Sequence, residues 1–273
     1  MRNMWTLIRE IVQKRNLIWD LAKADFRKRF VGSYFGVAWM FVQPVVTVLI
    51  YFFIFQMGFK SVPPIPGVPY VIWLVPGIVP WFFFGEALNG GTGCLQEYNY
   101  LVKKVVFNVS ILPVLKILSC LIVHGIFALI MVMLFFAFGR LPMVTWAGIL
   151  YYSFALSVLT LALSYITCSI QVFFKDMSQI VGIVLQIGMW MTPIMWDPFM
   201  FKDRPELMAS LEKVLRINPV YYIVVGYRDS MLSGNWFWQR PGLTLYFWGV
   251  TLILLWIGLR VFGSLKPHFS DVL

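Results

Sequence analysis

Four ionisable side chains lie within the long apolar stretches of this chain, and they are the first candidates for chemistry inside a membrane. Glu86, Lys116 and Arg260 lie near one expected end of their stretches, where long side chains reach the interface at modest cost. Only His124 is expected to be deep. We interpret it as a hydrogen-bonded packing residue, because it has no acidic companion. A proton-coupled carrier needs acidic groups near the midplane, so the pattern argues against one.

Motifs for catalysis and nucleotide binding are absent from the sequence. It contains no GxxxxGK[ST] phosphate loop, no DxD pair and no HExxH helix. Its three cysteines form neither a CxxC pair nor a Cys/His metal spacing, so we expect reduced packing residues. We therefore expect no catalytic site, no metal site and no cofactor in this chain. An integral glycosyltransferase or lipid phosphatase is disfavoured.

Aromatic side chains are the second group of candidates. Trp73, Trp81 and Phe84 are spaced so that, with Gly77, they share one face of a helix through the depth of a bilayer. Interfacial belts would instead confine such residues to the two headgroup levels. Aromatic faces stack on sugar rings, so we predict a path for a long glycan; packing or lipid contact is the plainer interpretation of each residue. Further candidates for the path are Trp39, Tyr51, Tyr152 and Tyr165.

The elements that position these residues are membrane-spanning helices. The chain is 60% hydrophobic and 12% charged, whereas soluble domains carry roughly 25% charged residues. One run, from Phe35 to Gln56, has 22 residues without a charge, and about 20 suffice to cross a bilayer. We predict an all-α membrane protein with six spans, placed near residues 35–56, 70–88, 111–138, 146–170, 179–196 and 244–263.

The basic residues indicate the orientation of these spans. Residues 1–34, 92–108, 171–178 and the tail 264–273 would lie on one side and hold 12 of the 22 Lys and Arg residues. The opposite short loops, 57–69 and 139–145, carry only Lys60 and Arg140. The positive-inside rule then predicts a multi-pass plasma membrane protein with both termini in the cytoplasm. This topology accounts for the net charge of +10 without nucleic acid.

Three segments outside the spans are expected to fold. Residues 1–34 mix basic and apolar residues, as is typical of an amphipathic helix that lies at the membrane interface. Such a helix either anchors the chain to lipid or docks a cytoplasmic partner. The loop 92–108 is expected to contain a short helix, either passive or pushed by a partner. In the external region 197–241, an amphipathic helix precedes residues 219–233, which are apolar but too short to cross, so we predict a re-entrant segment there.

Taken together, several segments resemble one known family. They are GSYFGVAWMFVQPVVTVLIYFFIF from Gly32, PGIVPWFFFGEAL from Pro76, LVKKVVFNVSILPVLKIL from Leu101, FFKDMSQIVGIVLQIGMWMTPIMW from Phe173 and RINPVYYIVVGYRDSML from Arg216. The chain resembles the permease subunits of type-2 ABC exporters of polysaccharides and polyol phosphates over nearly its whole length. The most specific residues are Gly36/Pro44, Lys175-Asp176, Thr192-Pro193, Asn218-Pro219 and Arg228. Many relatives carry a proline near Asn108 and Val109, so the local loop differs here.

The resemblance implies a half-transporter that pairs with a second copy of itself and with two copies of a separate ATP-binding subunit. ATP and Mg would be bound and hydrolysed by that partner. The interfacial helix and the loop after the second span would contact it, with Glu97, Tyr98, Asn99, Lys103 and Lys104 as coupling residues. The external re-entrant region would form a gate, with Asn218, Pro219, Tyr222 and Arg228 as its residues.

The expected substrate is a lipid pyrophosphate-linked anionic glycopolymer that enters from the inner leaflet. Its headgroup would lie near Arg27, Lys28 and Arg29, although these charges are equally explained by topology alone. The stretch from Val172 to Trp196 most resembles teichoic acid translocation permeases, so wall teichoic acid is the first expectation. An O-antigen or capsule permease is the alternative. A carrier or flippase that acts without ATP, and a non-transporting scaffold, are two other classes that stay open.

Overall fold

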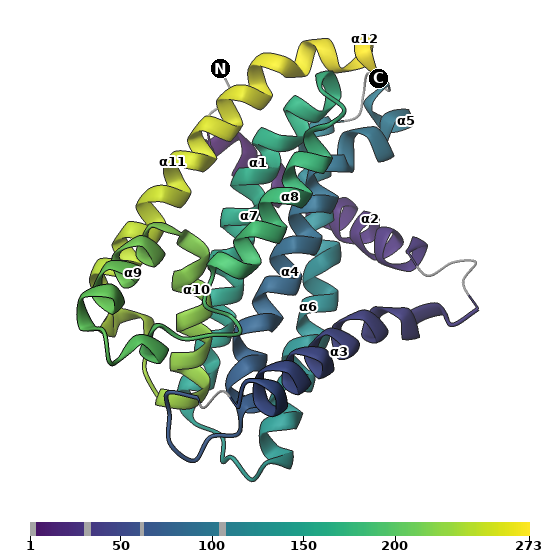
Figure 1. The fold of residues 1–273 in the computed structure, drawn as a ribbon. Helices are drawn as coiled ribbons and strands as arrows, with labels where there is room; N and C mark the ends of the chain where they lie inside the picture. Colours follow the sequence, from purple (N-terminus) through teal and green to yellow (C-terminus); the bar gives the residue numbers. More distant parts are fainter. Residues whose placement is uncertain (1–3, 30–33, 61–62, 104–107) are drawn as a thin grey trace.

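The computed structural model describes residues 4–29, 34–60, 63–103 and 108–273 of the chain. The described residues form helices joined by turns, and no strand occurs among them. The expectation of an all-helical protein is confirmed. Both ends of the described chain lie at the same end of the molecule (Figure 1).

Three long helices form the centre of the molecule: α4 (Tyr70–Glu97), α6 (Leu112–Ala137) and α7 (Gly148–Phe173). A fourth, α11 (Pro241–Leu265), packs along α7. Proline and glycine are tolerated within such helices because neighbouring helices satisfy the backbone. Helix α4 is the most buried of the candidate spans, with 78% of its most apolar window inside the protein. The centre of the bundle is therefore built around α4.

Helix α4 is longer than the predicted span, which ends near residue 88. The sequence Asn89-Gly-Gly-Thr-Gly suggests a break, yet the helix runs on to Glu97. A side chain at Gly91 would collide with Ser164 of α7, so the glycine permits a close helix contact here. One turn away, the Thr92 and Thr167 hydroxyls lie 2.7 Å apart. Packing against α7 therefore continues the helix where propensity alone favours a loop.

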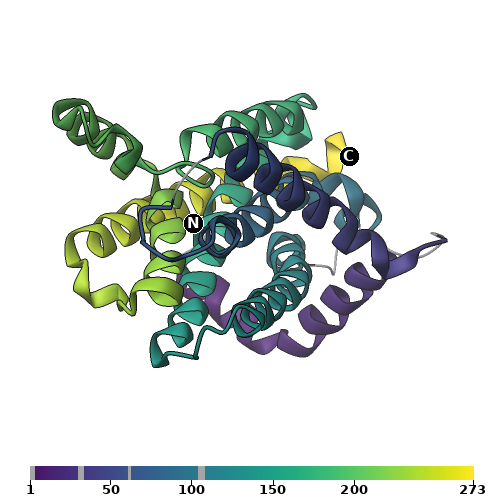
Figure 2. The ribbon, with the colours of Figure 1, turned by 60° about the horizontal axis from the view of Figure 1, so that its bottom comes forward.

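Helix α3 (Trp39–Tyr51) lies along the outside of the bundle (Figures 1 and 2). A 3-10 turn, Gly36–Ala38, precedes it and a π-helical turn, Phe52–Gly58, extends it, which gives a 23-residue apolar helix. None of its most apolar window is buried in the chain. Its surface is therefore available to lipid or to another protein.

Five helices among the described residues are long and apolar enough to cross a membrane: Gly36–Gly58, Tyr70–Glu97, Val109–Ala137, Val144–Phe173 and Pro241–Val272. The chain is thus a multi-pass membrane protein. The predicted fifth span, 179–196, corresponds to α8 (Met177–Met191), which has only 15 residues. A helix of this length extends about 22 Å along its axis, which is less than the ~30 Å thickness of the bilayer hydrocarbon. A count of six spans is therefore not confirmed by helix length.

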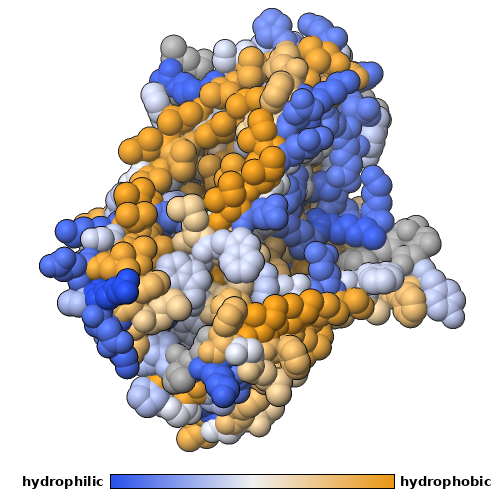
Figure 3. Space-filling view, in the orientation of Figure 1, coloured by the Kyte–Doolittle hydropathy of each residue, from blue (hydrophilic) through white to orange (hydrophobic). Residues whose placement is uncertain are grey.

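The N-terminal segment forms two helices, α1 (Met4–Gln13) and α2 (Arg15–Lys28), separated at Lys14. Helix α2 packs on α6 through Ile18 and Ala22, which are almost completely buried. The short helix α5 (Asn99–Val102) follows α4 at the same end of the molecule. Figure 3 shows hydrophilic residues gathered over this side, around α2 and α5, while α3 and α11 are covered by apolar residues.

The remaining elements follow α8 and close the other end of the bundle. They are the turn η5 (Pro198–Phe201), α9 (Pro205–Ile217), α10 (Pro219–Arg228), the π-helical turn η6 (Asp229–Ser233) and the turn η7 (Phe237–Gln239). After α11, a short turn η8 (Lys266–His268) leads to α12 (Phe269–Val272).

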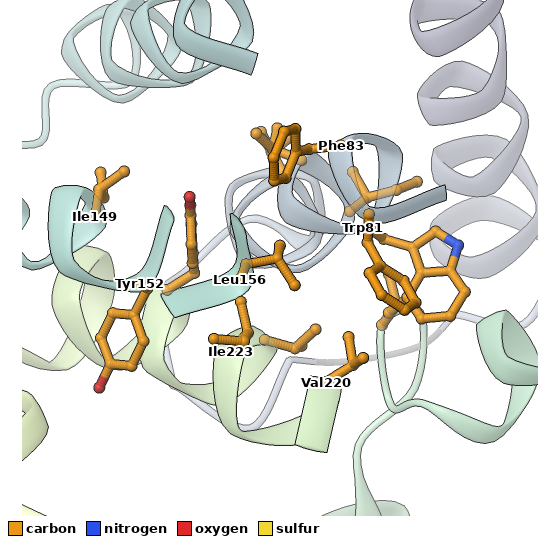
Figure 4. Packing of buried hydrophobic residues seen from close by; sticks show 14 of the residues in the cluster. Trp81, Phe83, Ile149, Tyr152, Leu156, Val220 and Ile223 are labelled. Carbon is orange, nitrogen blue, oxygen red and sulfur yellow. The ribbon is translucent and has the colours of Figure 1, made fainter. Parts of the chain in front are cut away.

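Helix α10 inserts its apolar face into the main core. Val220 and Ile223 lie against Leu156 of α7 and the aromatic side chains of α4 (Figure 4). Gly226 faces the ring of Tyr152 so closely that a side chain there would overlap it. The helical conformation of α10 is therefore stabilised by packing, because a helix of ten residues is only marginally stable in isolation.

Candidate functional site

A cavity of about 840 Å³ lies between α3 and the central helices. One wall is a single stripe of α3, made of Trp39, Gln43, Pro44, Thr47 and Tyr51. Thr47 donates a hydrogen bond to the Gln43 carbonyl at 2.8 Å, which satisfies its hydroxyl next to the proline. The Tyr51 hydroxyl lies 3.7 Å from the Met189 sulfur, so α3 and α8 meet at one end of the cavity.

The opposite wall belongs to α4 and α6, with Trp81, Phe82, Glu86, Asn89, His124 and Phe127 as principal residues. Arg29 and Glu86 form an ion pair at the end nearest α2. The wall thus combines aromatic faces, an amide and one ion pair. Such a surface contacts sugar rings and their hydroxyls, and it offers no nucleophile next to a base. No group of three His, Cys, Asp or Glu residues suited to a metal ion occurs in the described part of the chain.

Three of the seven aromatic candidates for the glycan path line this cavity: Trp39, Tyr51 and Trp81. Trp39 is 52% exposed on α3, and Trp81 lies across from it on α4. Phe84 packs on Trp81 with ring centroids 5.6 Å apart, but it faces a different, apolar pocket beside α8. Figure 4 shows Trp81 and Tyr152 at opposite sides of the core, with Leu156 between them.

The other aromatic candidates are core residues of this chain. Trp73 is buried beneath the guanidinium of Arg228, whose central carbon lies 3.6 Å from the ring centroid. Tyr165 is fully buried and donates a hydrogen bond to the Ser110 carbonyl at 2.8 Å. The structure therefore does not bring all seven aromatic candidates together in one chain, and their role in transport stays a prediction.

A second feature, which we call the charge cluster, joins α2, α4 and α6. Its members carry three negative and three positive charges: Asp25, Glu86, Glu97, Lys28, Arg29 and Lys116. The Lys116 ammonium lies 2.6 Å from Asp25 Oδ1 and 2.7 Å from Glu97 Oε2. Arg29 pairs with Glu86 and lies 3.4 Å from Asp25 Oδ2. A lysine was expected to reach the interface here, but this one is buried and paired, so that expectation is wrong.

Asp25 is the centre of the charge cluster. Its carboxylate also accepts a hydrogen bond from the Tyr98 hydroxyl at 2.6 Å, and its side chain is only 1% exposed. Burial alone would raise the pKa of Asp25, but the hydrogen bonds, foremost that from Lys116, reverse the effect and place this pKa below its usual range. The carboxylate is therefore ionised and fully partnered.

The predicted headgroup and coupling residues lie around this cluster. Lys28 is 62% exposed and only 3.6 Å from Glu97, Arg27 is exposed, and Arg29 is half-buried in its pair with Glu86. Tyr98 is buried, whereas Asn99 and Lys103 are exposed near α5. Lys104 lies outside the described residues. The structure thus brings the headgroup and coupling sets to one end of the molecule.

The predicted gate residues meet at the opposite end. Asn218 caps α10 by accepting a hydrogen bond from the Val220 amide at 3.0 Å, and Pro219 occupies the first helical position. The Asn218 amide also donates to Thr192 Oγ1 at 2.9 Å. Tyr222 lies 3.0 Å from both the Tyr151 and Thr244 hydroxyls.

Arg228 connects the far end of α10 to the break after α8. It donates to the carbonyls of Pro193 at 2.7 Å, Ile194 at 2.5 Å and Trp73 at 3.3 Å. Thr192-Pro193, Asn218-Pro219 and Arg228, which are separate in the sequence, are therefore one hydrogen-bonded unit.

One buried group, Asp25, was not assigned from the sequence. Asp25 lies on the apolar stripe of α2 with Ile18 and Ala22, and a carboxylate on such a stripe is the signal that it has a buried partner. His124 Nε2 lies 2.8 Å from the Tyr227 hydroxyl, which is 2.6 Å from Ser153 Oγ. This arrangement fits the interpretation of His124 as a packing residue.

Comparisons with known proteins agree with the membrane architecture. The family model described as "ABC-2 type transporter" matches residues 16–232. The chain is 28% identical to the O-antigen export system permease protein RfbA of Myxococcus xanthus, over 98% of this chain and 99% of that protein. It is 25% identical to an RfbA protein of Klebsiella pneumoniae, over 94% and 95% of the two chains. It is 22% identical to the polysialic acid transport protein KpsM of Escherichia coli, over 88% and 90%.

Proposed function

Because the chain belongs to the ABC-2 type transporter family, we propose that it is the membrane subunit of an ATP-driven exporter of lipid-linked polysaccharide. The observation that carries the proposal is similarity over nearly the full length to permeases named for O-antigen export and polysialic acid transport. The cavity beside α3 supports it, because aromatic and amide groups suit a sugar chain. The polymer would move from the inner to the outer face of the plasma membrane.

The ATP-binding subunit would be a separate protein, in two copies, that holds ATP and Mg. We place its docking surface on α1, α2 and α5, where exposed polar residues surround the charge cluster. Both termini would then face the cytoplasm, and the re-entrant residues 219–233, which form α10 and η6, would lie at the outer side as a gate. Glu97, Asn99 and Lys103 are the described coupling residues with exposed side chains at this surface.

A second copy of this chain would complete the membrane part. Support comes from the apolar faces of α3 and α8, which have no partner in one copy. Exposed large residues on these faces are Val42, Val45, Val46 and Leu49 on α3, Phe53 on the π-helical turn that extends it, and Ile180, Ile183, Val184 and Ile187 on α8. In a dimer the cavity beside α3 would face the partner, so that two copies enclose one path.

The substrate would enter at the end of the cavity near Arg29, where Arg27 and Lys28 are exposed to receive an anionic headgroup. Among polymers, the names of the relatives favour an O-antigen or capsule type. Wall teichoic acid stays a second candidate, favoured by the resemblance of the stretch from Val172 to Trp196 to teichoic acid permeases. The two differ chemically, because a teichoic acid carries phosphate in every repeat.

The experiment is purification of the tagged chain from its own host, followed by ATP hydrolysis assays. Lipid-linked glycan extracted from the same host's membranes is added as the probe. We expect a co-purified ATP-binding protein whose hydrolysis the extract stimulates, and phosphate analysis of the stimulating fraction separates the two polymers. A chain that purifies without any ATPase, yet moves the glycan across vesicles, would show a carrier instead. A chain that does neither would be a scaffold.

A further inference from the structure

The charge cluster contains a buried ammonium group that serves two helices at once. Lys116 on α6 holds Asp25 of α2 at 2.6 Å and Glu97 of α4 at 2.7 Å. An ammonium has three donors and no acceptor, so it can bind both carboxylates together. The three helices are distant in the sequence, since Asp25 of α2 lies 91 residues before Lys116. One charged atom therefore fixes the mutual position of three helices.

The neighbouring residues leave room for this contact. A methyl group placed on Gly90 would lie 3.8 Å from Lys116 Cδ, so the lysine stem runs along the surface of α4 at this glycine. From there it reaches Glu97, about two helical turns further along α4. The Lys116 side chain is only 5% exposed. Its ammonium is therefore directed along α4 toward the end at which the helix terminates.

Folding alone does not account for a buried lysine at this position. Removing an ammonium and a carboxylate from water costs free energy that their attraction does not generally exceed, and apolar residues of similar volume often serve stability equally well. The best-attested use of such a pair is to specify one register between elements. The geometry of the cluster fits this use, because Lys116 sets α2 against α4.

The two carboxylates differ in their access to a partner protein. Asp25 is 1% exposed, whereas Glu97 is 39% exposed and ends α4 directly before α5. Lys28 of α2 provides a second contact to Glu97 at 3.6 Å on the surface. A force on the α5 segment therefore acts on Glu97 and Tyr98, and it reaches α2 through Lys116 as well as through the direct hydrogen bond from Tyr98 to Asp25.

We propose that Lys116 is a positioning residue for transport, which makes the interfacial helix α2 move together with the end of α4. The inference rests on the proposed function, since a partner ATPase supplies the force. When that partner displaces Glu97, Lys116 and the Asp25 bound to it follow. The cavity end at Arg29 and Glu86 then changes with them, because Arg29 follows Asp25 by one turn of α2 and lies against it.

The test uses the full complex with its ATP-binding subunit, and the main variant is Glu97→Gln. This substitution removes one carboxylate charge at a partly exposed position and leaves the buried Asp25–Lys116 pair intact. The matched control is Glu212→Gln on α9, whose carboxylate is 38% exposed and pairs with Arg216 at 3.2 Å. Two quantities are measured for each variant. One is the export of the host's own polysaccharide to the cell surface per complex present, and the other is the rate of ATP hydrolysis by the same complex after purification. The ratio of export to ATP hydrolysis is then compared between variants.

We expect Glu97→Gln to lower this ratio by about fivefold or more, the lower end of measured coupling between sites. Glu212→Gln should leave it unchanged. Lys116→Met should give at least the effect of Glu97→Gln, while Lys116→Arg, which keeps the charge, should restore most of the ratio. Because Glu97 also lies at the proposed docking surface, a Lys116 variant decides the matter. If Lys116→Met fails to assemble, Lys116→Gln takes its place, since it removes the charge but keeps a hydrogen-bonding side chain.

An unchanged ratio in the Lys116 variant or in Glu97→Gln would overturn the inference, and so would variants that only reduce the amount of complex. A merely structural lysine gives that second result, because fewer complexes form but each one exports normally. If the unmodified chain shows no ATP-dependent export, the proposed function fails and the inference fails with it. The behaviour of the unmodified chain thus separates the two failures.

Discussion

Replacement of Arg228 by lysine should destabilise the end of the protein where α8, α9 and α10 meet, while keeping the charge. The guanidinium serves two segments at once: it donates to Pro193 at 2.7 Å and Ile194 at 2.5 Å after α8, and to Trp73 at 3.3 Å on α4. It also stacks on the Trp73 ring at 3.6 Å. A single ammonium cannot reproduce a planar fork with this stack.

The size of the effect follows from these contacts. We assume that lysine keeps the bonds to one segment and loses the other along with the stack. One hydrogen bond from a charged donor contributes ~1.5–3 kcal/mol, and a buried cation–π contact contributes ~1–2 kcal/mol. The loss is then about 2.5–5 kcal/mol, which corresponds to a fall in Tm of roughly 5–20 °C for a chain of this size.

The assay is thermal unfolding of the purified complex, followed by tryptophan fluorescence. Arg216→Lys is the control, because Arg216 pairs with Glu212 at 3.2 Å and the two side chains are 57% and 38% exposed. An exposed pair contributes only ~0–1 kcal/mol, so this control should lose less than about 4 °C. A Tm for Arg228→Lys equal to that of Arg216→Lys would refute the reasoning that the buried fork holds these segments together.

Three further predictions concern other parts of the structure. Gly226→Ala should lower the Tm by several degrees because its methyl group would overlap Tyr152, whereas Gly93→Ala, with open space around it, should not. The pKa of Asp25 is lowered on folding, so its ionised form stabilises the protein above the ordinary carboxyl pKa, and this stabilisation is lost as the pH falls through the folded value. The Tm difference between the unmodified chain and Asp25→Asn should therefore stay constant from about pH 7 to 5 and shrink below about pH 4, as measured by unfolding scans across this range. Trp81→Leu should slow polysaccharide export at unchanged complex yield, because the ring lines the cavity; equal export per complex would remove it from the path.

Local signals in the sequence were sufficient to locate the five long apolar helices, whereas the span predicted at 179–196 corresponds to the shorter α8. Long uncharged runs predict the helices that can cross a membrane, since length and composition decide that property. The start of α10 is also readable, because Asn218-Pro219 is a cap followed by a proline at the first helical position. The end of α4 is not readable in this way, because its continuation past Asn89 depends on contacts with α7.

The site depended more on partners distant in the sequence. The spacing of Trp73, Trp81 and Phe84 gives a common face of α4, but a face can meet either a cavity or other helices. Only Trp81 of the three lines the cavity beside α3. Lys116 was expected at the interface for the same reason. A hydropathy pattern predicts the length of a span but not which residues pack beside it, and the partner of Lys116 is Asp25, 91 residues earlier in the sequence.

Helix α4 connects the two polar ends of the molecule. At one end Glu86 and Glu97 bind the interfacial helix α2, eleven residues apart and therefore on the same face about three turns from each other. At the other end the Trp73 carbonyl and ring hold Arg228. Helix α4 is buried along most of its length, and Pro76 and Pro80 lie within it between these two ends. Under the proposed function, a displacement of the Glu97 end by a partner would pass along α4 toward the Arg228 contacts, and the two prolines are the positions at which the helix would bend first.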